Sequence, residues 1–197
     1  MKNLLFIAIL FISSCSSTKF LNEPSNSQTF QSPQTTALEA PILLLKTVSF
    51  KGKNGATVDL DVVGERLFKK IEDSGMFSEV IYYIEPETTP PNIMNANLSY
   101  EFERRGGNTT MNAVNFILMI GSGFILSPVL PLSFDYETKL VLEIDGKQYS
   151  ATSTIRETAT LNFSQTPGSQ VSNQITDQLF LANMNSVLNQ LKADIVD

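Results

Sequence analysis

The chain has 197 residues, of which 42% are hydrophobic and 17% are charged, and its formal net charge at pH 7 is −6. It contains one Cys and no His or Trp, so it cannot form an intrachain disulfide, a Ser-His-Asp triad or the usual zinc and iron ligand sets. These counts predict no cofactor and no metal site, and the acidic balance gives no electrostatic reason to expect nucleic acid as a partner.

The first residues have the pattern of a signal peptide. Lys2 forms a short basic start, and an apolar run from Leu4 to Ile12 follows, which is too short to span a membrane. The next residues complete the motif Ile12-Ser13-Ser14-Cys15, which resembles the lipobox of bacterial lipoproteins. The resemblance implies that residues 1–14 are removed and that Cys15 carries the lipid. The alternative is an ordinary secretory signal in which Cys15 is incidental.

The lipobox resemblance also implies a location. It places the chain in the bacterial cell envelope, held to a membrane through its N-terminal lipid. Ser16 and Ser17 follow the cysteine instead of Asp. In the lipoprotein family this feature implies release to the outer membrane, with the protein facing the periplasm.

A polar segment follows the cysteine. From Ser16 to Ala40 the chain is rich in Ser, Thr, Gln, Asn and Pro, a composition that buries too little apolar surface to order itself. Residues 15–40 are therefore predicted to be a lipidated flexible tether, and residues 41–197 a single domain. The alternative is that Phe20 or Phe30 docks on that domain or on another protein.

The domain is predicted to begin with a strand, a helix and a second strand. Ile42–Phe50 is a short aliphatic and β-branched run that is typical of a strand. Apolar residues then recur at helical intervals over 60–71, and Gly75 indicates that the helix stops near Ser74. Phe77–Glu85 is rich in Val, Ile and Tyr and predicts the second strand.

The junction between this helix and the second strand carries a second resemblance. Its sequence, Glu72-Asp73-Ser74-Gly75-Met76-Phe77-Ser78-Glu79-Val80, is similar to the helix-to-strand junction of small envelope domains with a β-α-β-β core. The amino-terminal domain of the Tol-Pal propeller protein is one such domain. The resemblance implies a fold and identifies no active residue.

The rest of the domain is predicted to be a meander of strands and a terminal helix. Polar and apolar residues alternate over Asn95–Arg105 and Phe134–Ile144, which we expect to be antiparallel neighbours. Asp145-Gly146 is a hairpin signal leading into Lys147–Glu157. Apolar residues over Val171–Ile195 fit a long helix. The expected fold is α+β, with an antiparallel sheet of about five strands and two helices on one face.

Two pairs of carboxylates are candidates for chemistry. Glu101 and Glu103 lie on one face of an expected strand and could serve an exported hydrolase, but alternation predicts that this face is solvated. Asp59 and Asp61 lie near an expected helix start, where they favour the helix dipole more readily than a metal ion. We therefore assign no catalytic residue.

The segment 112–132 stands out because no charged residue lies between Arg105 and Asp135. It is consistent with a partly exposed apolar hairpin or helix, a buried core element or a membrane span. Pro128 and Pro131 oppose a span because they withhold backbone donors from a continuous helix. We predict that the segment turns back on itself and offers side chains to a membrane surface or partner: Phe116, Ile117, Ile120, Phe124, Ile125 and Leu126.

These features favour a non-catalytic, lipid-anchored envelope lipoprotein. It would be an interaction or assembly factor in the periplasm, with an envelope protein as its partner. An alternative is a periplasmic carrier of an acyl or lipid ligand, which would need an enclosed apolar pocket beside Phe116–Leu126. A less favoured alternative is an exported hydrolase that uses carboxylates.

Overall fold

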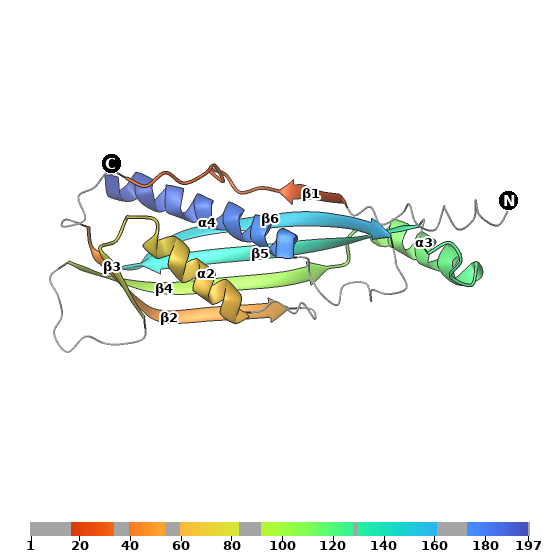
Figure 1. Ribbon diagram of the computed structural model, residues 1–197, viewed down its shortest axis with the longest axis horizontal. Coiled ribbons are helices and arrows are strands. Elements are labelled where there is room, and N and C mark those ends of the chain that lie inside the picture. The colour runs from red at the N-terminus through yellow and green to blue at the C-terminus, as the bar shows by residue number, and fades with distance from the viewer. Residues whose placement is uncertain are drawn as a thin grey trace, which may run out of the picture.

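The computed structural model describes residues 17–33, 40–53, 60–82, 92–127, 130–160 and 173–196. Within these residues lies one six-stranded sheet in the order β1-β6-β5-β4-β2-β3. The strands are β1 Ser17–Asn22, β2 Ile42–Lys53, β3 Glu79–Tyr82, β4 Ile93–Arg105, β5 Pro131–Ile144 and β6 Lys147–Thr160. The helices are α2 Leu60–Glu72, α3 Thr109–Gly121 and α4 Asn173–Val196. Helices α2 and α4 cover the same face of the sheet, whereas α3 projects beyond its end (Figure 1).

The centre of the sheet is the long hairpin of β5 and β6. Its strands pair without a break from Ile144 opposite Lys147 to Pro131 opposite Thr160. Asp145 and Gly146 both have positive φ, of 48° and 84°, as a two-residue hairpin turn requires. Strand β4 pairs antiparallel with β5. The predicted hairpin and its antiparallel neighbour are therefore confirmed.

The sheet is mixed, so the prediction of an antiparallel sheet of about five strands is wrong in both respects. Strand β2 runs parallel to β3 on one side and to β4 on the other. Helix α2 lies between β2 and β3 in the chain, and such a crossover returns the second strand in the same direction as the first. The coarser α+β class holds. The sixth strand is β1, which lies in the segment expected to be a tether.

The core lies between the sheet and its two covering helices. Leu98, Tyr100 and Phe102 alternate onto this face of β4 and are buried, as predicted. Helix α2 contributes Val63, Leu67 and Ile71 to the same cluster. The helix ends at Glu72 and Gly75 has φ +66°, which agrees with the predicted stop near Ser74.

Helix α4 buries one polar residue in its apolar stripe. Asn183 is fully buried, four residues after Leu179 and four before Val187. Its Nδ2 donates to Oγ1 of Thr138 at 2.7 Å, and that Oγ1 lies 3.0 Å from Oγ of Ser153. Asn183 therefore places a polar side chain within the apolar stripe of α4, and the core supplies a partner for its Nδ2.

The N-terminal segment is part of the fold. Strand β1 pairs antiparallel with β6, from Ser17 opposite Thr158 onward. Residues 23–33 then follow α4, whose polar side chains donate hydrogen bonds to backbone carbonyls. Oγ of Ser186 donates to Ser25 O at 2.6 Å, and Nδ2 of Asn189 donates to Asn26 O at 2.9 Å.

The prediction of a flexible tether over 15–40 is therefore wrong for residues 17–33. The alternative is confirmed, since Phe20 and Phe30 both pack against the core. Composition underestimates the order of this segment because its backbone partners come from β6 and α4, far along the chain. Residues 1–16, which include Cys15 and the predicted signal peptide 1–14, and residues 34–39 lie outside the described residues.

Deleting residues up to Ala40 should destabilise the domain, because it removes the β1 pairing and the partial burial of Phe20 and Phe30. We expect the free energy of unfolding to fall by about 2–4 kcal/mol. For a chain of this size, that loss lowers the melting temperature by roughly 5–15 °C. Thermal unfolding followed by circular dichroism measures it. A control that begins at Ser17 should melt like the mature chain. Equal melting temperatures for both truncations would show that the segment adds no stability.

Candidate functional site

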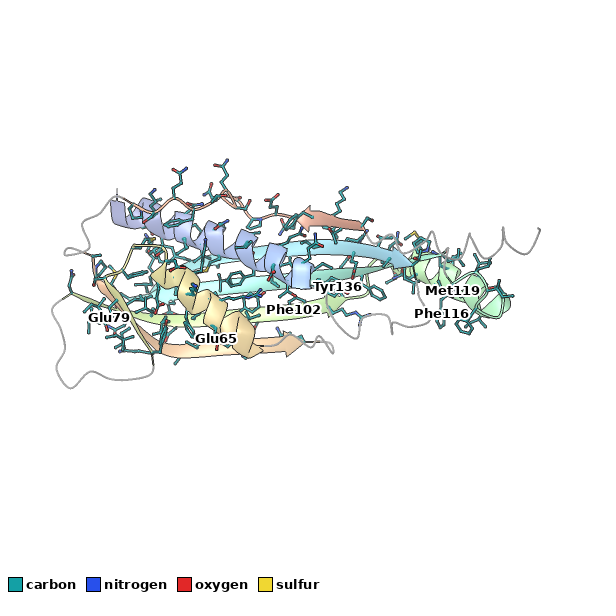
Figure 2. The ribbon with its side chains drawn as sticks, viewed as in Figure 1. Glu65, Glu79, Phe102, Phe116, Met119 and Tyr136 are labelled. Carbon is teal, nitrogen blue, oxygen red and sulfur yellow. The ribbon has the colours of Figure 1, made fainter. Side chains whose placement is uncertain are left out.

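Helix α3 and the turn after it form an apolar projection, defined here as residues 109–127. Figure 2 shows Phe116 and Met119 on this helix at the end of the molecule. Ile117 is 68% exposed and Ile125 is 71% exposed. The projection exposes eight large apolar side chains: Val114, Phe116, Ile117, Leu118, Ile120, Phe124, Ile125 and Leu126. All six residues that the sequence singles out for contact are among them.

The base of the projection is fixed to the start of β5 by two asparagines. The backbone N–H of Ser133 donates to Oδ1 of Asn112 at 2.8 Å, and Nδ2 of Asn112 donates back to Ser133 O at 2.7 Å. One turn further along, Nδ2 of Asn115 donates to Pro131 O at 2.6 Å. Met119 continues the same face and is fully buried. The helix is therefore held in place by its inner face while its outer face stays uncovered.

The entry to α3 also depends on a close approach. Gly107 has φ +58°, and a Cβ there would overlap the carbonyl oxygen of Ser133. Asn108 caps the helix, because its Oδ1 accepts from the N–H of Met111 at 3.2 Å. The direction in which α3 leaves the sheet is thus set by backbone geometry and by a cap.

The turn at the tip satisfies its own backbone donors. The N–H groups of Ser122, Gly123 and Phe124 donate to carbonyls of α3 at 2.7 to 3.0 Å. The N–H groups of Ile125 and Ser127 find acceptors within the turn, and that of Leu126 donates to Oγ of Ser122 at 3.3 Å. Every backbone N–H from Ser122 to Ser127 therefore has an acceptor within the protein.

Charged side chains around the base neutralise one another. Arg156 makes a bidentate pair with Asp135, through Nε and Nη2 at 2.7 and 2.8 Å. This contact raises the pKa of the Arg156 guanidinium. Arg105 bonds Glu137 at 2.8 Å and Glu103 at 3.2 Å. Arg105 and Arg156, at the base, are therefore both paired with carboxylates.

Glu101 and Glu103, the candidate carboxylates that the structure describes, both form ion pairs with neighbouring side chains. Glu101 accepts from Nζ of Lys53 at 2.9 Å, which holds its pKa below the usual value. A general acid needs the opposite shift. Across the described ranges, no group of three His, Cys, Asp or Glu residues could hold a metal ion. Asp59 and the side chain of Asp61 lie outside what is described.

Two further sequence-based alternatives concern lipid. A hollow between the N-terminal segment and α4 is lined by polar side chains, Asn26, Gln28, Thr29, Gln31, Asn189 and Lys192, which do not suit an acyl chain. Of the helices that the structure describes, none is long and apolar enough to cross a membrane. Over its described residues, the segment 112–132 agrees with the first alternative, because it forms a partly exposed helix and turn.

Sequence reasoning missed the residues that hold the projection. Asn108, Asn112, Asn115 and Met119 recur at four- and three-residue intervals, which places them on one face of a helix. Side-chain amides along one face of an otherwise apolar helix are the signal that could have revealed these contacts. The hydrogen bonds of Asn112 and Asn115 to the start of β5 are called the asparagine clamp below. Val114 and Leu118 are exposed as well and were not singled out.

Comparisons with known proteins identify no family. No family model matches the chain, and no curated protein matches it. It is similar to a solved structure described as a homolog of neuraminyllactose-binding hemagglutinin from Helicobacter pylori, with 10% identity, 88% of this chain and 92% of that chain covered, and a TM-score of 0.48. It is also similar to a dodecamer of a PelC variant from Paraburkholderia phytofirmans, with 10% identity, 88% and 98% covered, and a TM-score of 0.36.

Gly107→Ala should loosen the base of the projection, because the new Cβ overlaps Ser133 and alanine disfavours positive φ. We expect the free energy of unfolding, measured in urea, to fall by about 2–4 kcal/mol. Proteolysis within α3 should become faster. Gly123→Ala is the matched control: its φ is +61°, but a Cβ there meets open space. It should lose only about 1 kcal/mol. Equal losses for both variants would show that the close approach at Gly107 does not matter.

Proposed function

We propose that this protein is a non-catalytic, lipid-anchored envelope lipoprotein that works as an interaction or assembly factor through the apolar projection. Lipid on Cys15 would hold it to the outer membrane, facing the periplasm. The single observation that carries the proposal is the set of eight exposed apolar side chains on a helix and turn that are fixed at their base.

The physical argument is that this exposure is unfavourable unless something covers it. Fully burying one large apolar side chain is worth about 1.5–3 kcal/mol, so eight of them form a strong attraction to any apolar environment. Soluble chains seldom keep such a contiguous patch unless it is a contact site. The asparagine clamp supports the proposal as well, because it prevents the helix from folding back over the sheet to hide these side chains.

Lipidation of Cys15 is the first test. Labelling cells with a palmitate analogue should mark the wild-type chain and leave Cys15→Ala unlabelled. Stable anchoring requires at least two acyl chains, which the lipoprotein pathway supplies. Cys15→Ser is a second variant without a thiol that should behave like Cys15→Ala. Equal label on wild type and both variants would refute lipid attachment at this residue.

The apolar projection is the second test. Replacing both Phe124 and Leu126 by Asp should reduce chemical crosslinking of the protein to envelope components several-fold, because charges oppose transfer of the tip into an apolar environment. The melting temperature should stay within about 2 °C, since both side chains are exposed. Leu181→Asp, an exposed apolar residue on α4, is the control and should crosslink like wild type. Unfolding of the double variant would show that the segment is core.

A further inference from the structure

The geometry points to a specific occupant for the apolar projection: the acyl chains of the same membrane leaflet that holds the Cys15 lipid. This inference deepens the proposed function and depends on lipidation at Cys15. It makes the projection a second membrane anchor beside the first. Three observations carry it: where the described chain begins, how apolar side chains are distributed around α3, and how the tip satisfies its backbone N–H groups.

Strand β1, where the described residues begin, starts near the base of the projection. Ser17 pairs with Thr158, Thr158 pairs with Ser133, and Ser133 bonds Asn112 at the base of α3. Strands lie about 4.8 Å apart, so two strand spacings, roughly 10 Å, separate Ser17 from Ser133. Cys15 precedes Ser17 by two residues, a link that spans at most about 7 Å. Figure 1 shows the start of β1 near the base of α3. A lipid attached two residues before Ser17 would therefore meet the membrane beside the projection.

The apolar side chains suit insertion better than docking in a protein groove. At 100° per residue, Phe116, Ile117 and Val114, together with Leu118 and Ile120, cover about 200° of the circumference of α3. A helix that docks in a protein groove usually contacts it with one narrower stripe. The inner face, marked by Asn115 and Met119, is the one held against the domain. Lipid can surround the remainder because it conforms to any shape.

Helix α3 is shorter than the hydrocarbon core of a bilayer is thick. Its 13 residues rise about 20 Å, whereas the hydrocarbon core of a bilayer is about 30 Å thick. The chain then turns at Ser122 and returns to β5, so both ends of the projection lie on the same side. Hydrocarbon offers no partners for backbone donors, and every amide from Ser122 to Ser127 already has one. The tip can therefore enter lipid without exposing an unpaired N–H.

The charges at the base predict which lipids suffice. Arg105 and Arg156 are both paired with carboxylates, and no charged residue lies between Arg105 and Asp135. Attraction to anionic headgroups thus contributes little to the free energy of insertion, and transfer of the apolar side chains into lipid dominates it. Insertion should occur in zwitterionic phosphatidylcholine and should change little with salt concentration.

The absence of Trp from the chain allows a direct test. The lipidated full chain carrying Ile125→Trp is reconstituted in phosphatidylcholine vesicles with and without brominated acyl chains, and Trp fluorescence is measured. Phe116→Trp is a second probe on α3, and Gln148→Trp, beside the β5–β6 turn at the far end, is the matched control. We expect blue-shifted emission that bromine quenches about twofold or more at 125 and 116, with no quenching at 148.

Each other outcome has one meaning. If the chain stays on the vesicles through its lipid while both α3 probes emit as in water, the inference is overturned and the anchoring proposal stands. If the emission is blue-shifted but bromine does not quench it, protein covers the projection and the inference is again overturned. If the chain carries no lipid and leaves the vesicles, the proposed anchoring itself fails.

Discussion

The β5–β6 hairpin is the constraint on which the other elements depend. Its 14-residue strands pair with β4 on one side and β1 on the other, and α4 packs across both strands. The turn at Asp145 and Gly146 sets the register, and a slip of one residue would turn every core side chain to the opposite face. Because β5 starts where the projection ends, the same register also fixes the place from which the apolar projection emerges.

Much of this sheet is predictable because its signals are local. The alternation in β4, β5 and β6 and the Asp-Gly turn each occupy consecutive residues, so one sequence suffices to find them. Strand β1 is different, since Ser17–Asn22 has no apolar pattern and is ordered by pairing with residues 154–158. The parallel pairing of β2 with β4 is also non-local, because it depends on how the chain returns after β3.

The candidate site divides in the same way. A long run without charge reveals an unusual apolar segment, so Phe116, Ile117, Ile120, Phe124, Ile125 and Leu126 are found from composition. Composition does not reveal the direction in which α3 leaves the sheet. That direction depends on Asn112 and Asn115, which donate hydrogen bonds to the backbone of β5 about twenty residues later. Composition thus identifies the apolar side chains of the projection, and tertiary contacts determine that they are exposed to solvent and not buried in the core.

The length of the hairpin has a mechanical consequence. A chain held by lipid alone can tilt and swivel, whereas attachment at two neighbouring points would fix its tilt relative to the bilayer. Fourteen residues of β5 rise about 45 Å, so the Asp145-Gly146 turn would stand at that height above the surface. The sheet would then act as a rigid spacer that presents its distal turn at a constant distance from the membrane, and lengthening β5 and β6 by two residues each would raise that turn by roughly 7 Å.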